Sequence, residues 1–113
     1  MGKLIKSINT MSFPIKLNSD SFTSFHNAIN LQILELDKIE QHELGKKLVL
    51  NELLLLDEKL CKVSYWTKPV YSFRITRSQA LTLMIIFNGF QSEDIYQANV
   101  LRKILNPINQ LLL

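Results

Sequence analysis

The chain has 113 residues, a net charge of +3, a hydrophobic fraction of 47% and a charged fraction of 20%, values typical of one globular domain with a single core. Its apolar runs are far shorter than the roughly 18 residues that cross a bilayer, so we expect no transmembrane segment. The single cysteine, Cys61, excludes an internal disulfide and favours a reducing, cytoplasmic or other intracellular location, with a mitochondrial location as the alternative because no acid precedes Asp20.

Two stretches of the chain follow the same pattern. Residues 13–17 and 71–76 alternate apolar and polar side chains, which is typical of a half-buried strand. Each stretch leads through a short polar step into apolar residues at helical spacing. The pattern predicts two similar strand-to-helix units. We interpret residues 1–11 as an N-terminal arm and residues 12–113 as a single compact domain.

The first half of the domain is predicted to hold one strand and two helices. The strand covers residues 12–17, and Pro14 places it at a sheet edge because proline lacks an N–H donor. A helix begins near Asp20, where several neighbouring side chains can cap it, and we expect Gly45 to end or kink it. A second, leucine-rich helix covers residues 46–62.

The second half repeats this order. A strand is predicted over residues 70–76 and a helix over residues 78–88. Ser92 is expected to cap a fourth helix, which Asn106-Pro107 should break. We therefore predict a mostly helical α+β fold, β-α-α-β-α-α, with two short strands in a small antiparallel sheet packed by about four helices. An all-α bundle is the alternative, because two-stranded sheets are marginal.

Metal chemistry finds little support in the sequence. His26 and His42 are sixteen residues apart and belong to no recognisable ligand motif. We expect both histidines to be ordinary surface or capped side chains. The sequence therefore predicts no metal site and no cofactor.

A catalytic group is equally hard to find. Lys59 and Lys62 flank Cys61 and could lower its pKa, but no histidine is near it in the sequence, so we interpret it as a buried free cysteine. The acids between residues 40 and 58 are expected to form a solvated helix face. We predict no catalytic residue, no enzymatic activity and no small-molecule substrate.

The helix over residues 46–62 carries leucines on nearly every side. Such a helix is usually buried on two faces, and one of them can belong to another subunit. The favoured function is therefore that of a non-enzymatic protein-binding or structural subunit, acting as an oligomer or within a larger assembly. The predicted interface residues are Leu50, Leu54, Leu111, Leu112 and Leu113.

Charge is segregated along the chain. Residues 20–58 carry a net charge of −5, whereas residues 59–77 hold five cations and no acid, interleaved with aromatic side chains. Cations neutralise phosphates and exposed aromatic rings stack on bases, so the alternative function is that of a nucleic-acid-binding accessory protein. Its predicted contacts are Lys62, Trp66, Lys68, Arg74 and Arg77; Tyr71 and Phe73 share the apolar face of their strand and are expected in the core.

Overall fold

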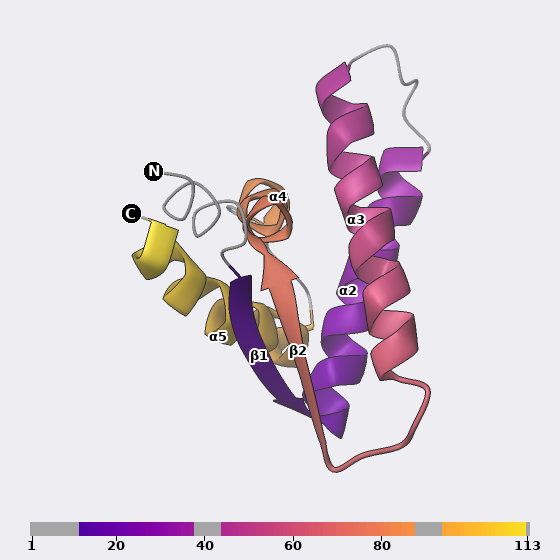
Figure 1. The fold of residues 1–113 in the computed structure, drawn as a ribbon, viewed down its shortest axis with the longest axis vertical. Helices are drawn as coiled ribbons and strands as arrows, with labels where there is room; N and C mark the ends of the chain where they lie inside the picture. The colour runs from indigo at the N-terminus through magenta and orange to yellow at the C-terminus, as the bar shows by residue number, and fades with distance from the viewer. Residues whose placement is uncertain (1–11, 38–43, 88–93, 113) are drawn as a thin grey trace, which may run out of the picture.

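Four helices pack against a two-stranded sheet in the computed structural model, which describes residues 12–37, 44–87 and 94–112 (Figure 1). The element order β-α-α-β-α-α confirms the predicted α+β fold and rules out the all-α alternative. The elements are β1 (Ser12–Asn18), α2 (Ser19–Asp37), α3 (Leu44–Val63), β2 (Val70–Thr76), α4 (Arg77–Phe87) and α5 (Ile95–Leu112).

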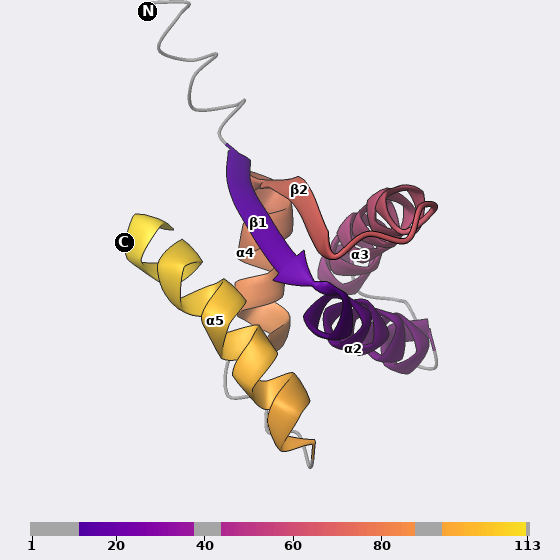
Figure 2. The same cartoon turned by 90° about the horizontal axis from the view of Figure 1, so that it is seen from below.

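The sheet is antiparallel, and its register runs from Ser12 opposite Thr76 to Asn18 opposite Val70. Alternate side chains of both strands face the helices and are buried, as the period of two requires. Figure 2 shows α2, α4 and α5 on one side of the sheet and α3 beside β2. A two-stranded sheet is marginal by itself, so packing of this inner face on the helices stabilises it. The inner face consists of Phe13, Ile15, Tyr71, Phe73 and Ile75.

The sequence repeat extends over both halves of the fold, because β1-α2-α3 is followed by β2-α4-α5. Ile15 lies opposite Phe73 in the sheet, and these residues also correspond in the two repeats, at an offset of 58. The helix contacts show the same equivalence, in which α2 corresponds to α4 and α3 to α5. Helix α2 contacts α3 and α5, and its equivalent α4 contacts α5 and α3. The halves are therefore related by an approximate two-fold axis near Ile15 and Phe73.

Helix α2 and helix α4 begin directly at the ends of their strands, at equivalent caps. The Ser21 N–H donates to Asn18 Oδ1 at 2.8 Å, and the Gln79 N–H donates to Thr76 Oγ1 at 3.1 Å. In the second half Gln79 Oε1 also accepts from the Thr76 N–H at 2.9 Å, which completes a reciprocal capping box. Side-chain capping thus ends both strands and starts both helices.

The core joins both halves of the chain. Phe22 of α2 stacks on Tyr71 of β2 with ring centroids 4.3 Å apart, and Phe25 stacks on Phe73 at 6.1 Å. The largest fully buried side chains come from four elements: Phe25, Ile29, Leu53, Leu56, Leu60, Ile75 and Leu83.

Two expected helix breaks are wrong. Gly45 lies in the first turn of α3 instead of ending the preceding helix, and a Cβ atom there would meet open space. Pro107 lies inside α5, which continues to Leu112. Its ring removes one backbone hydrogen bond, but Ile104 and Ile108 on either side are buried, so packing keeps the helix continuous. The predicted cap Ser92 lies outside the described residues.

Candidate functional site

Helix α3 exposes leucines to solvent although it also supplies much of the core. Leu53, Leu56 and Leu60 are buried, whereas Leu48, Leu54 and Leu55 are 59%, 48% and 47% exposed. At 100° per residue, Leu48 and Leu55 lie on nearly the same side of the helix, since they are seven residues apart. We call the solvent-exposed strip the outer face of α3; it consists of Lys47, Leu48, Asn51, Leu54, Leu55 and Glu58.

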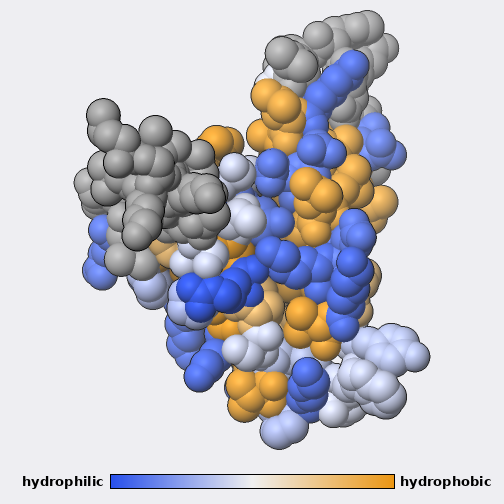
Figure 3. Space-filling view, viewed as in Figure 1, coloured by the Kyte–Doolittle hydropathy of each residue, from blue (hydrophilic) through white to orange (hydrophobic). Residues whose placement is uncertain are grey.

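A groove of about 740 Å³ continues this apolar surface toward α4. Leu48 and Val49 of α3 line one side, and Leu81 and Ile85 of α4 line the other. Figure 3 shows apolar side chains alternating with hydrophilic ones along α3. Exposed apolar side chains beside an apolar groove are a common feature of protein-binding sites.

The predicted interface residues have separate outcomes. Leu54 lies on the outer face of α3, and Leu50 is half-buried on the same helix. The side chains of Leu111 and Leu112, and the whole of Leu113, lie outside what the structure describes. The structure therefore describes the surroundings of Leu50 and Leu54, and a role in an interface stays a prediction for all five leucines.

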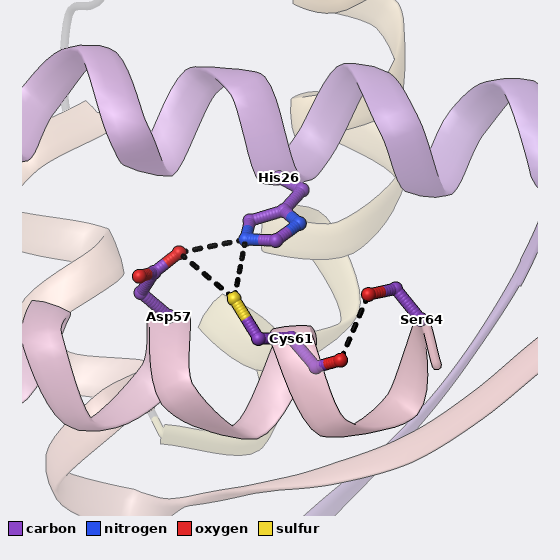
Figure 4. Close-up of polar contacts among 4 residues, drawn as sticks. All are labelled: His26, Asp57, Cys61 and Ser64. Atoms are coloured by element: carbon purple, nitrogen blue, oxygen red, sulfur yellow. Dashed lines mark hydrogen bonds and ion pairs between the residues drawn. The ribbon is translucent and has the colours of Figure 1, made fainter. Parts of the chain in front are cut away.

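Three polar side chains meet where α2 packs against α3 (Figure 4). His26 Nε2 lies 2.6 Å from Asp57 Oδ1, and the Cys61 Sγ lies 3.9 Å from the same nitrogen and 4.0 Å from the same oxygen. Asp57 and Cys61 are four residues apart on α3, so they share one side of that helix. The His26 and Phe22 rings form an edge-type contact, with centroids 5.9 Å apart and an interplanar angle of 61°. We call these three residues the polar cluster.

Cys61 differs from its predicted environment in two respects. The residue is exposed, whereas the sequence predicted a buried thiol. Partial desolvation of the sulfur between the helices, followed by the charge of Asp57, raises the pKa of the thiol above its usual value of 9.0. The flanking lysines do not lower it, because Lys62 pairs with Glu58 at 3.4 Å and Lys59 donates to the Arg74 carbonyl at 2.8 Å.

This geometry differs from that of an activated cysteine nucleophile. In such a site the histidine uses one ring nitrogen toward the thiol and the other toward its orienting carboxylate. Here Asp57 and Cys61 both face the same nitrogen of His26, and the pKa of the thiol is raised. The polar cluster instead brings a nitrogen, an oxygen and a sulfur atom within 4.8 Å of one another, a set of atoms that can bind a metal ion.

The structure divides the predicted nucleic-acid contacts into two groups. Lys62, Trp66 and Lys68 lie near the loop that precedes β2, where the Tyr65 and Trp66 rings are 75% and 68% exposed. Arg74 and Arg77 lie beyond the middle of β2 and at its far end, and Arg74 Nε donates to Ser12 Oγ at 2.7 Å. Since a strand rises about 3.3 Å per residue, Arg77 and the loop lie at opposite ends of a strand of roughly 20 Å.

Sequence reasoning considered His26, Asp57 and Cys61 one at a time and did not join them. His26 is 31 residues from Asp57, so only the packing of α2 on α3 brings the two together. The four-residue spacing of Asp57 and Cys61 on a predicted helix was the one local signal. Sequence reasoning considered Lys59 only as a cation beside Cys61 and as part of the basic segment; in the structure it donates to Gln79 Oε1 at 3.1 Å, and desolvation lowers its pKa.

Among the described residues, none of the helices combines the length and the apolarity needed to cross a membrane. Comparison of the chain with protein-family models, with curated proteins and with solved structures gives no match.

Proposed function

We propose that this protein is a non-enzymatic protein-binding subunit that assembles with a second copy of itself through the outer face of α3. The observation that carries the proposal is the exposure of Leu48, Leu54 and Leu55 on a helix whose opposite side forms the core. When another surface covers water-exposed leucines next to an apolar groove, apolar area is removed from water and the free energy of the system falls.

A second copy is favoured as the occupant because the charges of the outer face are self-complementary. Lys47 lies near one end of the strip and Glu58 near the other. When two α3 helices pair antiparallel, each Lys47 meets the Glu58 of the other copy. Such isologous contacts are typical of two-fold dimers, and the charges select the antiparallel direction.

The expected affinity is modest. Removing the remaining exposure of one leucine contributes about 1 kcal/mol, and six leucines in a dimer contribute roughly 6 kcal/mol. Association itself costs about 4–15 kcal/mol, which is comparable to or larger than this contribution. The groove residues Leu81 and Ile85 must therefore contribute to the interface as well. We therefore expect a reversible dimer, and the concentration dependence of its mass is the relevant measurement.

The test is light scattering coupled to size exclusion over a micromolar concentration series, at low and high salt. We expect the wild-type mass to approach that of a dimer, and Leu55→Asp and Leu54→Asp to keep it at that of a monomer. Leu31→Asp is the matched control, because Leu31 is 54% exposed on α2 and lies outside this face. A monomeric wild type at every concentration, or an equal effect of Leu31→Asp, would contradict the proposal.

A second candidate function rests on the loop before β2. Its exposed aromatic pair, with Tyr65 and Trp66 ring centroids 5.0 Å apart, lies between Lys62 and Lys68, an arrangement suited to single-stranded nucleic acid. We expect any such binding to weaken with salt and to be lost in Trp66→Ala, while Arg74→Ala/Arg77→Ala has the smaller effect. No binding of single-stranded DNA or RNA at low salt would remove this candidate.

A further inference from the structure

The polar cluster combines three different ligand atoms on two packed helices. His26 Nε2, Asp57 Oδ1 and Cys61 Sγ all lie within 4.8 Å of one another. We propose that these three atoms bind one Zn²⁺ ion at the seam between α2 and α3. This site departs from the expectation that the chain has no metal ligands, which rested on the spacing of its two histidines. It is independent of self-association through α3.

The distances are close to those of a tetrahedral zinc site. With usual bond lengths, a sulfur and a nitrogen ligand lie about 3.6 Å apart, and a nitrogen and an oxygen ligand about 3.3 Å apart. Sγ lies 3.9 Å from Nε2, slightly farther than this value, and Nε2 lies 2.6 Å from Oδ1, somewhat closer. Changes of less than about 1 Å, within reach of side-chain rotation, would convert the hydrogen-bonded cluster into a coordination sphere.

The three side chains project from two helices that pack against each other. Asp57 and Cys61 lie one helical turn apart on α3. At the end of that helix the Cys61 carbonyl accepts a hydrogen bond from Ser64 Oγ at 2.8 Å. His26 projects from the middle of α2, beside the buried Phe22 and Phe25. Ligands held on packed helices keep their separation without the ion, which lowers the cost of ordering them when it binds.

The donor set selects the class of metal. A thiolate, an imidazole and a carboxylate together suit the borderline Zn²⁺ ion, whereas Mg²⁺ and Ca²⁺ require oxygen ligands. On binding, Zn²⁺ replaces two protons: the thiol proton, which passes to the buffer, and the proton between His26 Nε2 and Asp57 Oδ1, which moves to Nδ1 of a neutral ring or, from a protonated ring, to the buffer. Three protein ligands leave one tetrahedral position for water or another ligand, and the exposed Cys61 keeps this position within reach of solvent.

The experiment titrates the metal-free full chain with Zn²⁺ by calorimetry and with Co²⁺ by absorption spectroscopy. We expect one ion per chain and, with Co²⁺, a thiolate-to-metal charge-transfer band together with the visible bands of tetrahedral cobalt. Cys61→Ser removes the charge-transfer band, and His26→Gln and Asp57→Asn each weaken Zn²⁺ binding about tenfold or more. Zn²⁺ should also raise the melting temperature of the wild type, because the ion binds only the folded arrangement.

Matched variants separate this site from adventitious binding. Glu58→Gln removes the neighbouring carboxylate, which pairs with Lys62, and should leave the Zn²⁺ affinity unchanged. His42→Gln removes the other histidine and should also have no effect. Circular dichroism verifies that each variant is folded. Cys61→Ser changes the side chain little in size at an exposed position, so it remains informative if His26→Gln does not fold. The proposal is overturned if the wild type binds no Zn²⁺, or if Cys61→Ser binds as tightly with unchanged cobalt bands.

Discussion

The two β-α-α halves share a scaffold but differ in what they carry between their helices. Position 26 of α2 corresponds, at the offset of 58, to position 84 of α4, and the histidine of the first half is replaced there by Met84. The polar cluster belongs to the first half, whereas the buried core continues through both. The comparison teaches that the scaffold does not require the cluster, so a function of His26, Asp57 and Cys61 can be altered while the fold is retained.

The largest effects are expected from the two equivalent core positions. Phe25 and Leu83 correspond at the same offset, and both are fully buried. Phe25→Ala should lower the free energy of unfolding by about 3–5 kcal/mol and Leu83→Ala by about 2–5 kcal/mol, measured by urea denaturation. The exposed Leu31→Ala serves as the control and should stay within about 0.5 kcal/mol of wild type. A comparably small change for Leu83→Ala would show that the second half does not share the common core.

Pro107 distinguishes α5 from its counterpart α3, which has no proline. Pro107→Ala restores an N–H donor for the Lys103 carbonyl, and the greater freedom of the unfolded chain offsets part of this gain. We expect the free energy of unfolding to increase by about 1–2 kcal/mol, visible as a higher melting temperature. Asn106→Ala controls for helix propensity at a neighbouring exposed position. Destabilisation by Pro107→Ala would mean that the proline ring itself contributes to the core.

The two helix caps give a finer comparison. Asn18→Ala and Thr76→Ala should each lower the free energy of unfolding by about 1 kcal/mol. The loss should be smaller for Thr76→Ala, because Gln79 Oε1 still accepts from the residue 76 N–H. Ser78→Ala, a substitution beside the second cap, should leave stability nearly unchanged. If Thr76→Ala instead costs more than Asn18→Ala, the reciprocal bond does not persist without its partner.

The smallest effect concerns the acidity of the Cys61 thiol in the metal-free protein. Desolvation and the charge of Asp57 raise its pKa, so the thiolate forms only at higher pH than in an ordinary cysteine. The pH dependence of alkylation by iodoacetamide, with a chelator present, should show an apparent pKa above that of an unperturbed cysteine. Asp57→Asn should shift this profile toward lower pH, and Glu58→Gln should shift it less. An unshifted profile in Asp57→Asn would remove the electrostatic part of the explanation.

Local patterns predicted the fold well because each one has a local physical cause. The alternation of Val70–Thr76 predicted β2 with its observed bounds, and the polar residues after the first strand predicted a cap there. The cap at Thr76 was not predicted, because this residue was counted only as the end of the second strand. Gly45 was misjudged because it lies in the first turn of α3 and does not end the preceding helix. Pro107 was misjudged because its intrinsic preference was weighed without tertiary packing. Ile104 and Ile108 are buried on either side of the proline, and their packing outweighs its local cost.

The candidate sites were less accessible to sequence reasoning. Leu54 lies on the helix that the sequence predicted, but only the structure separates its exposed side chain from the buried Leu53 and Leu56. The polar cluster depends on the rotation of α2 relative to α3, which brings His26 to face Asp57 and Cys61. Helical periodicity predicts which residues share a face of one helix, but it does not predict which face of another helix they contact.

The pairing of β1 with β2 has a consequence for the order of events during synthesis. Ser12 pairs with Thr76, so β1 can pair only after more than half of the chain, including β2, has been synthesised. A ribosome therefore releases Phe13, Ile15 and the inner side of α2 into solvent well before β2 and α5 can cover them. Closing so long a loop is slow relative to forming a helix. The nascent first half is accordingly the state in which this chain is most open to chaperones and to aggregation.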